Sequence, residues 1–450
     1  MEPIKYIAQN ERDEQWGLTI CSVGYQKVGS NEVYPPKKHN QEYLFRPENG
    51  RILSEYQLLY IVEGEGVLCT RHSGRHVIKS GDMFLLFPGE WHTYQPSSDG
   101  WKEYWIGFQG ANIDLRVQNG QEKPWNVKFW GVGNEAWGCG GNMTPEYYVG
   151  EYRRFATFME GQDLFKVASG ANVDDYHWTE TLMKGIPLRM LDGITLHHYS
   201  FPTWEKKGPA TGYSEQEYFE TMKTALRMDE LIIKHTAIMD KYDPNKKIAL
   251  VVDEWGGWFD VEQGTNPGFL YQQNTMRDAM IAGATLNIFN NHSDRVKIAN
   301  LAQCVNVLQS VILTDKEKML LTPTYHVMEM YKIHQDATLI PVEVKTSDYV
   351  FGKEKLPAVS VSASKSTTGL THVSLVNIHS SKSEEIEIDI TGEEYKNVSG
   401  RILTSKKVDD HNTFDQPERI KPAAFSQAKL KGGKLKVTVP PFSLVVLALN

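Results

Sequence analysis

The feature that most constrains the fold is a short apolar run that ends in a carboxylate, and it occurs twice. Residues 127–132 are apolar and aromatic and lead into Gly133, Asn134 and Glu135. Residues 247–252 form a second, mainly apolar run that leads into Asp253 and Glu254. Such runs predict strands buried on both faces of a parallel sheet. In β/α barrels the carboxyl ends of the strands carry the chemistry, so both glutamates are catalytic candidates.

Strand and helix patterns alternate from residue 119 to about residue 336. Thr144 with Pro145, and Ser214 with Glu217, are signatures of helix starts. The strand-helix order requires a parallel sheet with right-handed crossovers and predicts a partial TIM-type (β/α) barrel of about five units. The strands are expected at 127–132, 164–170, 192–199, 247–254 and 285–289, and the helices at 145–159, 177–184, 214–241, 272–284 and 296–311.

A pair of glutamates at strand ends suggests glycoside hydrolysis. One carboxylate attacks the sugar while the other protonates the leaving oxygen. Either residue alone could equally cap a helix or pair with a cation. The two together are the stronger signal, and a retaining mechanism would place their carboxyl groups about 5 to 5.5 Å apart.

Residues 131–146 (GVGNEAWGCGGNMTPE) and 253–255 (DEW) resemble the two catalytic blocks of family 51 α-L-arabinofuranosidases. The resemblance implies that Glu135 is the acid/base after the fourth barrel strand and Glu254 the nucleophile after the seventh. The five expected strands would then be strands four to eight. The first three β/α units are absent, and with them part of the wall that holds the sugar in that family.

The same resemblance assigns a substrate-binding set. Asn134 would bind the 2-hydroxyl of the sugar, and Tyr199, beside His197, would orient the nucleophile. Trp258 and Gln303 match positions near the same sugar, although packing explains Trp258 equally well and an ordinary helix residue explains Gln303. Three weaker candidates lie on the leaving-group side: Tyr176, His177 and Trp178.

Residues 1–118 form a separate β-rich module of short strands and glycine turns, which predicts a small barrel or sandwich. Segments 81–92 (GDMFLLFPGEWH) and 101–110 (WKEYWIGFQG) resemble the cupin-like sensor domain of AraC-type regulators. No His-x-His pair is present at 56–66, which leaves His92 nearly alone, so we expect no metal site. Hydrolase-like sequence replaces the regulator's helix-turn-helix, so no nucleic-acid binding is expected.

Residues 337–450 mostly alternate between apolar and polar positions, which predicts a C-terminal β-sandwich. Strands are expected at 342–345, 358–363, 371–377, 385–390, 399–403, 434–439 and 443–449. This domain resembles the C-terminal domain of the same hydrolase family, with a supporting role. The loop 408–415 could approach the active site, although a solvated loop is the simpler interpretation.

Composition limits the remaining possibilities. A net charge of −8 argues against a nucleic-acid surface. The four cysteines are scattered, and the sequence has neither an apolar signal region at its start nor a membrane-length apolar run. We therefore expect a cytoplasmic protein without cofactors. Relatives in the family are oligomeric, so a homo-oligomer is expected by analogy.

Three hypotheses follow. The first is a retaining, exo-acting α-L-arabinofuranosidase that releases L-arabinose from arabinan or arabinoxylan oligosaccharides. The second is a catalytically impaired sugar-binding or sensory chimera in which the cupin-like pocket does the binding. The third is a chain recombined near Asn119 and Gly120 without a selected function.

Overall fold

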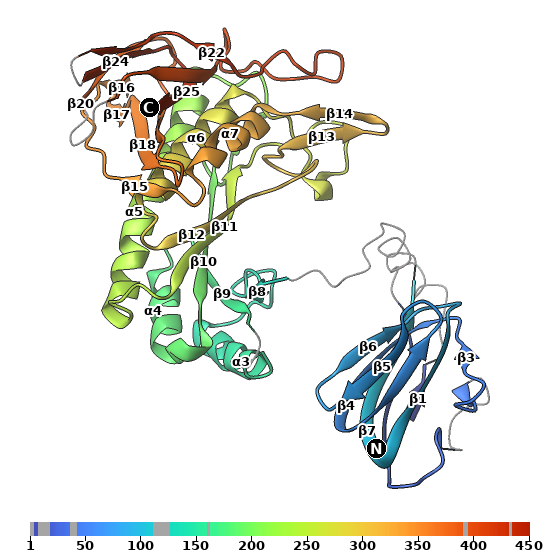
Figure 1. The fold of residues 1–450 in the computed structure, drawn as a ribbon. Helices are drawn as coiled ribbons and strands as arrows, with labels where there is room; N and C mark the ends of the chain where they lie inside the picture. The colour runs from blue at the N-terminus through green and yellow to red at the C-terminus, as the bar shows by residue number, and fades with distance from the viewer. Residues whose placement is uncertain are drawn as a thin grey trace. The chain divides into compact units, whose positions relative to one another are not determined.

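The computed structural model describes residues 4–7, 19–36, 43–110, 127–159, 163–389, 395–431 and 434–450. The chain divides into two compact units, Met1–Asn126 and Val127–Asn450. Its elements fit a multidomain α/β plus β protein (Figure 1). The expected boundary at residues 118 and 119 lies outside the described residues.

The first unit is built on one antiparallel sheet in the order β1-β2-β7-β4-β5, with β3 paired to β7 and β6 to β4. Its core includes Leu59, Ile61 and Trp101. The strands are β1 (Ile4–Tyr6), β2 (Thr19–Val28), β3 (Arg51–Ile52), β4 (Tyr56–Thr70), β5 (Gly74–Lys79), β6 (Met83–Leu86) and β7 (Trp91–Gln109).

Not every glycine of this unit lies in a turn, because β4 runs through Gly64 and Gly66 as one strand. Its pairing with β7 shifts register between Ile61 and Glu63 and again between Gly64 and Gly66. A Cβ on Gly64 would lie 2.3 Å from the Gly100 carbonyl oxygen, and φ at Gly64 is +89°. Here glycine serves to bend a strand rather than to end it.

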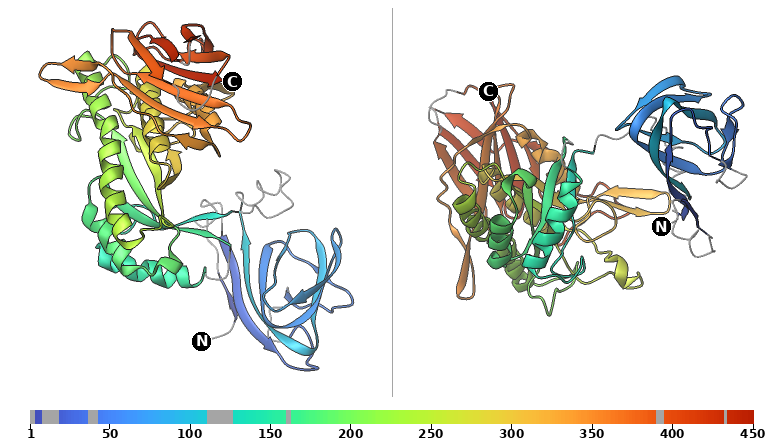
Figure 2. Two further views of the ribbon diagram at one scale, coloured as in Figure 1. Left: turned by 60° about the vertical axis from the view of Figure 1, so that its left-hand side comes forward. Right: turned by 90° about the horizontal axis from the view of Figure 1, so that it is seen from below.

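The second unit begins with a five-stranded parallel sheet in the order β12-β11-β10-β9-β8 (Figures 1 and 2). Four of its strands are at the expected places. The sheet and its helices comprise β8 (Phe129–Val132), α3 (Pro145–Thr157), β9 (Phe165–Asn172), α4 (Tyr176–Gly185), β10 (Gly193–Ser200), α5 (Glu215–Tyr242), β11 (Ala249–Gly257), α6 (Met276–Asn291) and β12 (Val296–Leu301).

Side chains alternate between the two faces of this sheet. On β11, Leu250 and Val252 join the large core shared with the helices. Ala249 and Val251 belong to a separate cluster on the opposite face, which contains only strand residues. On β10, Ile194 and Leu196 face the helices. Because strand residues alternate, Thr195, His197 and Tyr199 face the other way, which we call the inner face.

Two expected elements are wrong. Residues 285–289 are not a strand but the last part of α6, and residues 296–311 begin with β12 rather than forming a helix. Helix α6 is buried on nearly all sides, so its apolar residues show no helical stripe. A short apolar run of this kind cannot be assigned to helix or strand from periodicity.

The C-terminal part of the second unit consists of a six-stranded sheet, β15-β18-β19-β25-β21-β22, and a three-stranded sheet, β20-β24-β23. It shares one core with the helices, and Asn287 of α6 donates a hydrogen bond to Ser360. The strands are β15 (Thr338–Ile340), β18 (Val359–Lys365), β19 (Thr371–Asn377), β20 (Glu384–Asp389), β21 (Val398–Leu403), β22 (Ala423–Phe425), β23 (Ala428–Lys431), β24 (Lys434–Val439) and β25 (Ser443–Leu449).

The strand expected at 342–345 is absent, and β15 ends just before Pro341 instead. Proline has no N–H to continue a ladder, which accounts for the position of that end. Two antiparallel hairpins and one helix complete the unit: β13 (Ile312–Asp315) with β14 (Lys318–Leu321), β16 (Asp348–Phe351) with β17 (Glu354–Pro357), and α7 (Pro323–Tyr331).

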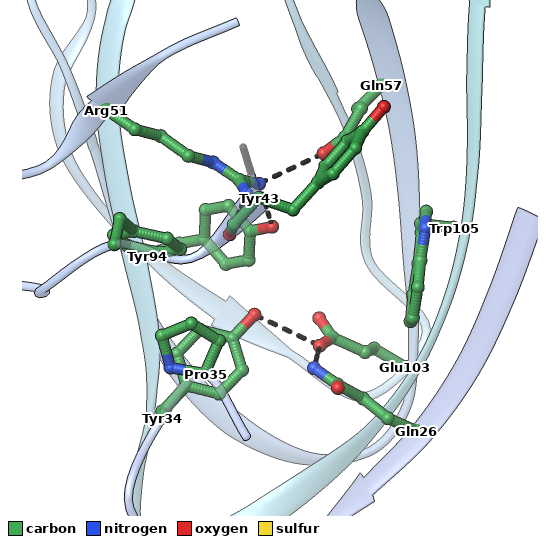
Figure 3. Close-up of a pocket in the computed structure, with 10 residues that line it drawn as sticks. Gln26, Tyr34, Pro35, Tyr43, Arg51, Gln57, Tyr94, Glu103 and Trp105 are labelled. Atoms are coloured by element: carbon green, nitrogen blue, oxygen red, sulfur yellow. Dashed lines mark hydrogen bonds between the residues drawn. The ribbon is translucent and has the colours of Figure 1, made fainter. Parts of the chain in front are cut away.

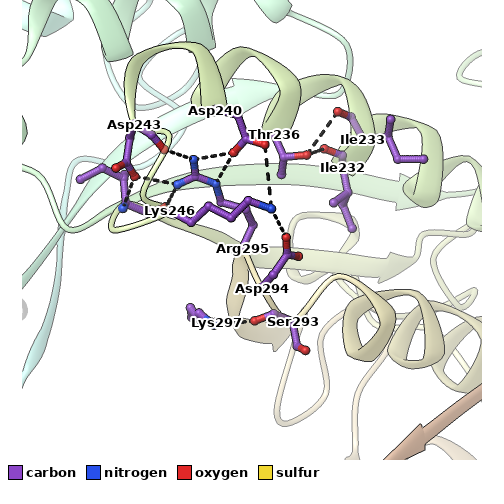
Figure 4. A network of polar contacts seen from close by, with 11 residues as sticks. Ile232, Ile233, Thr236, Asp240, Asp243, Lys246, Ser293, Asp294, Arg295 and Lys297 are labelled. Carbon is purple, nitrogen blue, oxygen red and sulfur yellow. Dashed lines mark hydrogen bonds and ion pairs between the residues drawn. The ribbon is translucent and has the colours of Figure 1, made fainter. Parts of the chain in front are cut away.

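At the amino ends of the strands, a buried arginine joins three elements (Figure 4). Arg295, just before β12, donates to Asp240 of α5 at 2.6 Å and to Asp243 at 2.8 Å. It also donates to the carbonyl oxygen of Ile248, just before β11. This network therefore fixes the end of the sheet opposite to the two glutamates.

None of the helices in the described part of the chain is long and apolar enough to cross a membrane.

Candidate active site

Glu135 is held by a tight turn that follows β8. Its own φ is +44° and that of Gly133 is +96°, both in the left-handed region. A Cβ on Gly140 would lie 1.6 Å from the carbonyl oxygen of Asn134, so the turn folds back on itself closely. A non-glycine residue at positive φ stores strain, which is frequent where a side chain must point into a site.

His197 and Tyr199 lie on the inner face of β10, and Glu254 lies opposite His197 on β11. Between the pairs Thr195–Val251 and His197–Glu254, β11 has one residue more than β10. Such a bulge changes the direction of side chains. It lets two consecutive residues, Asp253 and Glu254, both approach His197, which a regular strand would prevent.

These side chains form one polar cluster around His197. Its Nδ1 donates to Glu135 Oε1 at 3.0 Å and lies 3.4 Å from Glu254 Oε2. Its Nε2 contacts Asp253 Oδ1 at 3.1 Å. The Tyr199 hydroxyl donates to Glu254 Oε1 at 2.6 Å. The His197 side chain is almost fully buried, whereas the carboxylates are partly open to solvent.

The cluster sets the charges of its members. Burial disfavours the charged ring of His197, but its bonds to Asp253 and Glu135 and the nearby Glu254 outweigh burial and raise the pKa of His197 to about 9. The bond from His197 lowers the pKa of Glu135, against the effect of its partial burial. Burial, together with the bond to Glu254, keeps the pKa of Tyr199 above its usual value, so Tyr199 remains a donor.

One ligand atom from each of Glu135, His197 and Glu254 lies within 4.8 Å of the other two. One oxygen of each carboxylate is therefore within 4.8 Å of the other, below the roughly 6.5 to 9.5 Å that separates the carboxyl groups of an inverting glycosidase. A cation could use the same three atoms only if the ring were deprotonated, because a metal needs a free lone pair. With its raised pKa, His197 directs a proton at the glutamates instead.

The other expected site residues lie on segments at the same end of the sheet. Asn134 belongs to the Glu135 turn and is exposed. Trp258 directly follows β11, and its ring meets Tyr199 edge-on at 5.0 Å. Gln303 is not a helix residue but lies just beyond β12, whose Leu301 pairs with Trp255. Of the weaker candidates, Trp178 is buried in the core and donates to the carbonyl oxygen of Ser169.

Sequence reasoning missed three contributions. The sequence assigns Asp253 no role beyond the DEW motif, although two adjacent acids at a strand end can indicate a bulge. Cys139 is one of the four scattered cysteines, and its thiol donates to Glu135 Oε2 at 3.2 Å. The third is an aromatic cluster after β10, in which Lys207 lies 4.3 Å from the ring of Trp204 and 5.0 Å from that of Trp258.

The loop at 408–415 is not simply solvated at its start. Tyr213 donates to the Val408 carbonyl oxygen at 2.8 Å, and the backbone N–H of Gly212 donates to Asp409. His411 lines a pocket together with Asp260 and Glu262, which follow β11. The C-terminal part therefore touches the loops that follow β10 and β11.

The first unit has a polar pocket of its own (Figure 3). Arg51 donates to Gln57 at 3.1 Å and to Tyr94 at 2.6 Å. Across the pocket, Tyr34 donates to Glu103 at 3.0 Å, while burial raises the pKa of Glu103 to about 7. The second carboxylate oxygen of Glu103 is buried without a hydrogen-bond partner among the described residues.

His92, the only histidine that matched a cupin metal position, lies beside this pocket. Its Nδ1 donates to the Glu90 carbonyl oxygen at 3.0 Å, and its Nε2 accepts from Arg51 at 3.2 Å. Burial, followed by the charge of Arg51, lowers the pKa of His92 to about 4. Both ring nitrogens are engaged, so His92 is a hydrogen-bonded structural residue.

Comparison with known proteins identifies both parts of the chain. Residues 32–123 match the AraC-like ligand binding domain family, and residues 253–443 match the α-L-arabinofuranosidase C-terminal domain family. An intracellular exo-α-L-arabinofuranosidase of Bacteroides ovatus is 46% identical over 356 residues, which cover 77% of this chain and 69% of that protein. The probable α-L-arabinofuranosidase C of Aspergillus niger is 26% identical over 314 residues, and this chain spans only 60% of its length.

A solved structure gives the same result. The GH51 arabinofuranosidase from Xanthomonas axonopodis pv. citri is 45% identical and superposes with a TM-score of 0.72, over 76% of this chain and 70% of that one. The chain therefore belongs to glycoside hydrolase family 51, and it carries an AraC-like ligand-binding domain ahead of its family 51 sequence.

Proposed function

We propose that this protein is a retaining, exo-acting α-L-arabinofuranosidase that releases L-arabinose from arabinan or arabinoxylan oligosaccharides. The observation that carries the proposal is the spacing of Glu135 and Glu254, which each place a carboxylate oxygen within 4.8 Å of the other, at the carboxyl ends of β8 and β11 of one parallel sheet. The relatives from Bacteroides ovatus and Xanthomonas are named as arabinofuranosidases, which supports the same chemistry.

In this mechanism Glu254 is the nucleophile. Tyr199 holds one of its oxygens, and the other, which lies 3.4 Å from His197 Nδ1, attacks the anomeric carbon. The attack forms a glycosyl ester on Glu254 and releases the leaving oxygen, which takes a proton from Glu135. Glu135 then removes a proton from water, and that water hydrolyses the ester. Asn134 would bind the 2-hydroxyl, and Trp258 and Gln303 would line the sugar.

The lowered pKa of Glu135 needs an explanation, because a general acid must carry a proton. His197 provides it. The protonated ring donates to Glu135, so the required proton already lies in the bond between them. A sugar that covers Glu135 would exclude water, raise the pKa of its carboxyl group and move the proton towards it.

The test is hydrolysis of 4-nitrophenyl α-L-arabinofuranoside. We expect Glu254→Gln to reduce kcat by at least about 10³-fold, because the ester can no longer form. Glu135→Ala should reduce it by about 10² to 10⁴-fold and regain activity with azide. Glu317→Gln, at an exposed glutamate in the β13–β14 turn, is the matched control. Full activity in Glu254→Gln would refute the proposal.

A second candidate function is sugar binding by the AraC-like unit. The buried oxygen of Glu103 without a partner supports it, because a sugar hydroxyl could donate there. Calorimetric titration of the full chain with L-arabinose tests this, with Glu103→Leu as the variant that should lose the heat signal.

Three further expectations stay predictions. They are the domain boundaries at 118/119 and 336/337, the assignment of β8 to β12 as barrel strands four to eight, and homo-oligomerisation.

A further inference from the structure

The five-stranded parallel sheet has two open edges. β8 pairs only with β9, and β12 only with β11, among the residues that the structure describes. A parallel sheet is ordinarily covered on both faces, and an unpaired edge strand presents free N–H and C=O groups to other chains. Both edges of this sheet can therefore accept further strands.

The inner face of the sheet is apolar at the end opposite to the glutamates. Phe165, Val167, Ala249, Val251 and Ile298 form a cluster there without any helix residue. The Phe129 ring of β8 extends the cluster, with its centroid 5.2 Å from that of Phe165. A closed (β/α) barrel fills its interior with such layers, contributed by strands around the whole circle.

The layer is unfinished at the β8 edge. Phe129 is 56% exposed and its neighbour Trp130 is 46% exposed, and Val127 just before the strand is 48% exposed. Phe129 and Trp130 are consecutive and so project from opposite faces of β8, which leaves a large apolar side chain exposed on each face of this edge. The exposed residues lie where the next strand of a barrel would pack.

We infer that a second polypeptide of three β/α units docks between the β8 and β12 edges and completes an eight-stranded barrel. Five strands are three short of closure. The match to the Xanthomonas enzyme covers only 70% of that chain, so nearly a third of a closely related fold has no counterpart here. The partner's strands run parallel to β8, and its helices continue the outer layer of α3 and α4.

This inference rests on the proposed function, because the added strand ends would complete the wall around Glu135 and Glu254. Without them the inner face of the site is open on one side. The incoming units therefore act on the reaction by enclosing the sugar, while the chemistry stays on this chain.

The experiment uses the segment of the Bacteroides ovatus relative that precedes its counterpart of Phe129, co-expressed with the full tagged chain. We expect a 1:1 complex by light scattering and turnover of 4-nitrophenyl α-L-arabinofuranoside well above that of the chain alone. Phe129→Lys should weaken the complex by about tenfold or more. Val350→Lys, at an exposed apolar residue of β16, should leave it unchanged.

The outcomes separate the two proposals. A complex without turnover supports docking and counts against the proposed function. Turnover by the chain alone, with no complex, overturns the docking inference and leaves the function standing. Absence of both complex and turnover, with a normally folded chain by circular dichroism, overturns it as well. A homodimer that Phe129→Lys separates would overturn it by showing that a second copy covers the edge.

Discussion

At the scale of single residues, His197 is the hub of the site. One ring contacts three carboxylates, from Glu135, Asp253 and Glu254, through its two nitrogens. Three carboxylates this close would repel one another if all were ionised and no cation lay between them. The imidazolium therefore holds the carboxylates of Glu135 and Glu254 together.

The raised pKa of His197 predicts how stability depends on pH. Its folded pKa is about 9, against about 6.5 for a free histidine. The stabilisation is therefore fully present below pH 6.5 and is lost as the pH rises through 9. It amounts to at most about 3 kcal/mol. In urea unfolding, His197→Asn should be less stable than the wild type at pH 6, and the gap should narrow by pH 9.5. A gap that stays constant over this range would contradict the prediction.

The sequence predicts the two glutamates as site residues because each follows a buried strand, a pattern that needs no knowledge of contacts. It did not identify Asp253 as a partner of His197. In a regular strand Asp253 and Glu254 point to opposite faces, and only the bulge in β11 brings both to one histidine. The contact between Cys139 and Glu135 was not predicted for a similar reason, because the turn that brings the thiol back to Glu135 depends on positive φ angles.

At the scale of elements, the positions of strands and helices were predicted correctly where the opposite faces of an element have different surroundings. Strands β9 and β10 and helix α5, with its capping box at Ser214 and Glu217, are where the patterns placed them. Prediction failed at α6, which lies between the parallel sheet and the C-terminal sheets and is buried on nearly all sides. What covers a helix on its second face is tertiary information, which periodicity does not contain.

Arg295 gives a prediction for the sheet end opposite to the active site. The Arg295→Ala variant leaves Asp243, whose side chain is also buried, without its main counter-charge. Breaking a buried ion pair on one side costs about 3 to 5 kcal/mol. Chemical unfolding should show this loss, whereas Lys434→Ala, which removes exposed pairs to Glu387 and Asp389, should cost less than about 1 kcal/mol. Equal losses in the two variants would be inconsistent with this account.

The aromatic cluster after β10 gives a prediction about substrate. Trp204 is 62% exposed, and its ring meets Trp258 edge-on at 5.9 Å. Because Trp258 contacts Tyr199, Trp204 lies on the outer side of the site, where a leaving sugar could stack. Trp204→Ala should raise KM for an arabino-oligosaccharide by about two- to tenfold, with little change in kcat. Kinetics with Leu188→Ala, at another exposed apolar residue, provide the comparison. An unchanged KM would exclude this role.

At the scale of the whole molecule, each of the two units has its own main hydrophobic core. One belongs to the AraC-like unit and includes Ile61, and the other joins the parallel sheet, its helices and the C-terminal strands and includes Ile194. Each core is internally continuous, so each unit has what a domain needs to fold by itself. The same chain can therefore combine an AraC-like unit with a family 51 sequence built on a five-stranded parallel sheet.

Two cores predict two unfolding steps for the full chain in differential scanning calorimetry. Ile61 and Ile194 are both fully buried, so replacing either by alanine creates a cavity that costs about 2 to 5 kcal/mol. Ile61→Ala should lower the midpoint of one step, and Ile194→Ala that of the other. Because both substitutions remove the same groups, each is the control for the other.

If both shifted a single common step, the two units would unfold cooperatively, and the AraC-like unit would have to stabilise the open barrel directly. Independent steps would instead mean that the AraC-like unit does not stabilise the sheet edges. The docking polypeptide should then raise the midpoint of only the step that Ile194→Ala lowers.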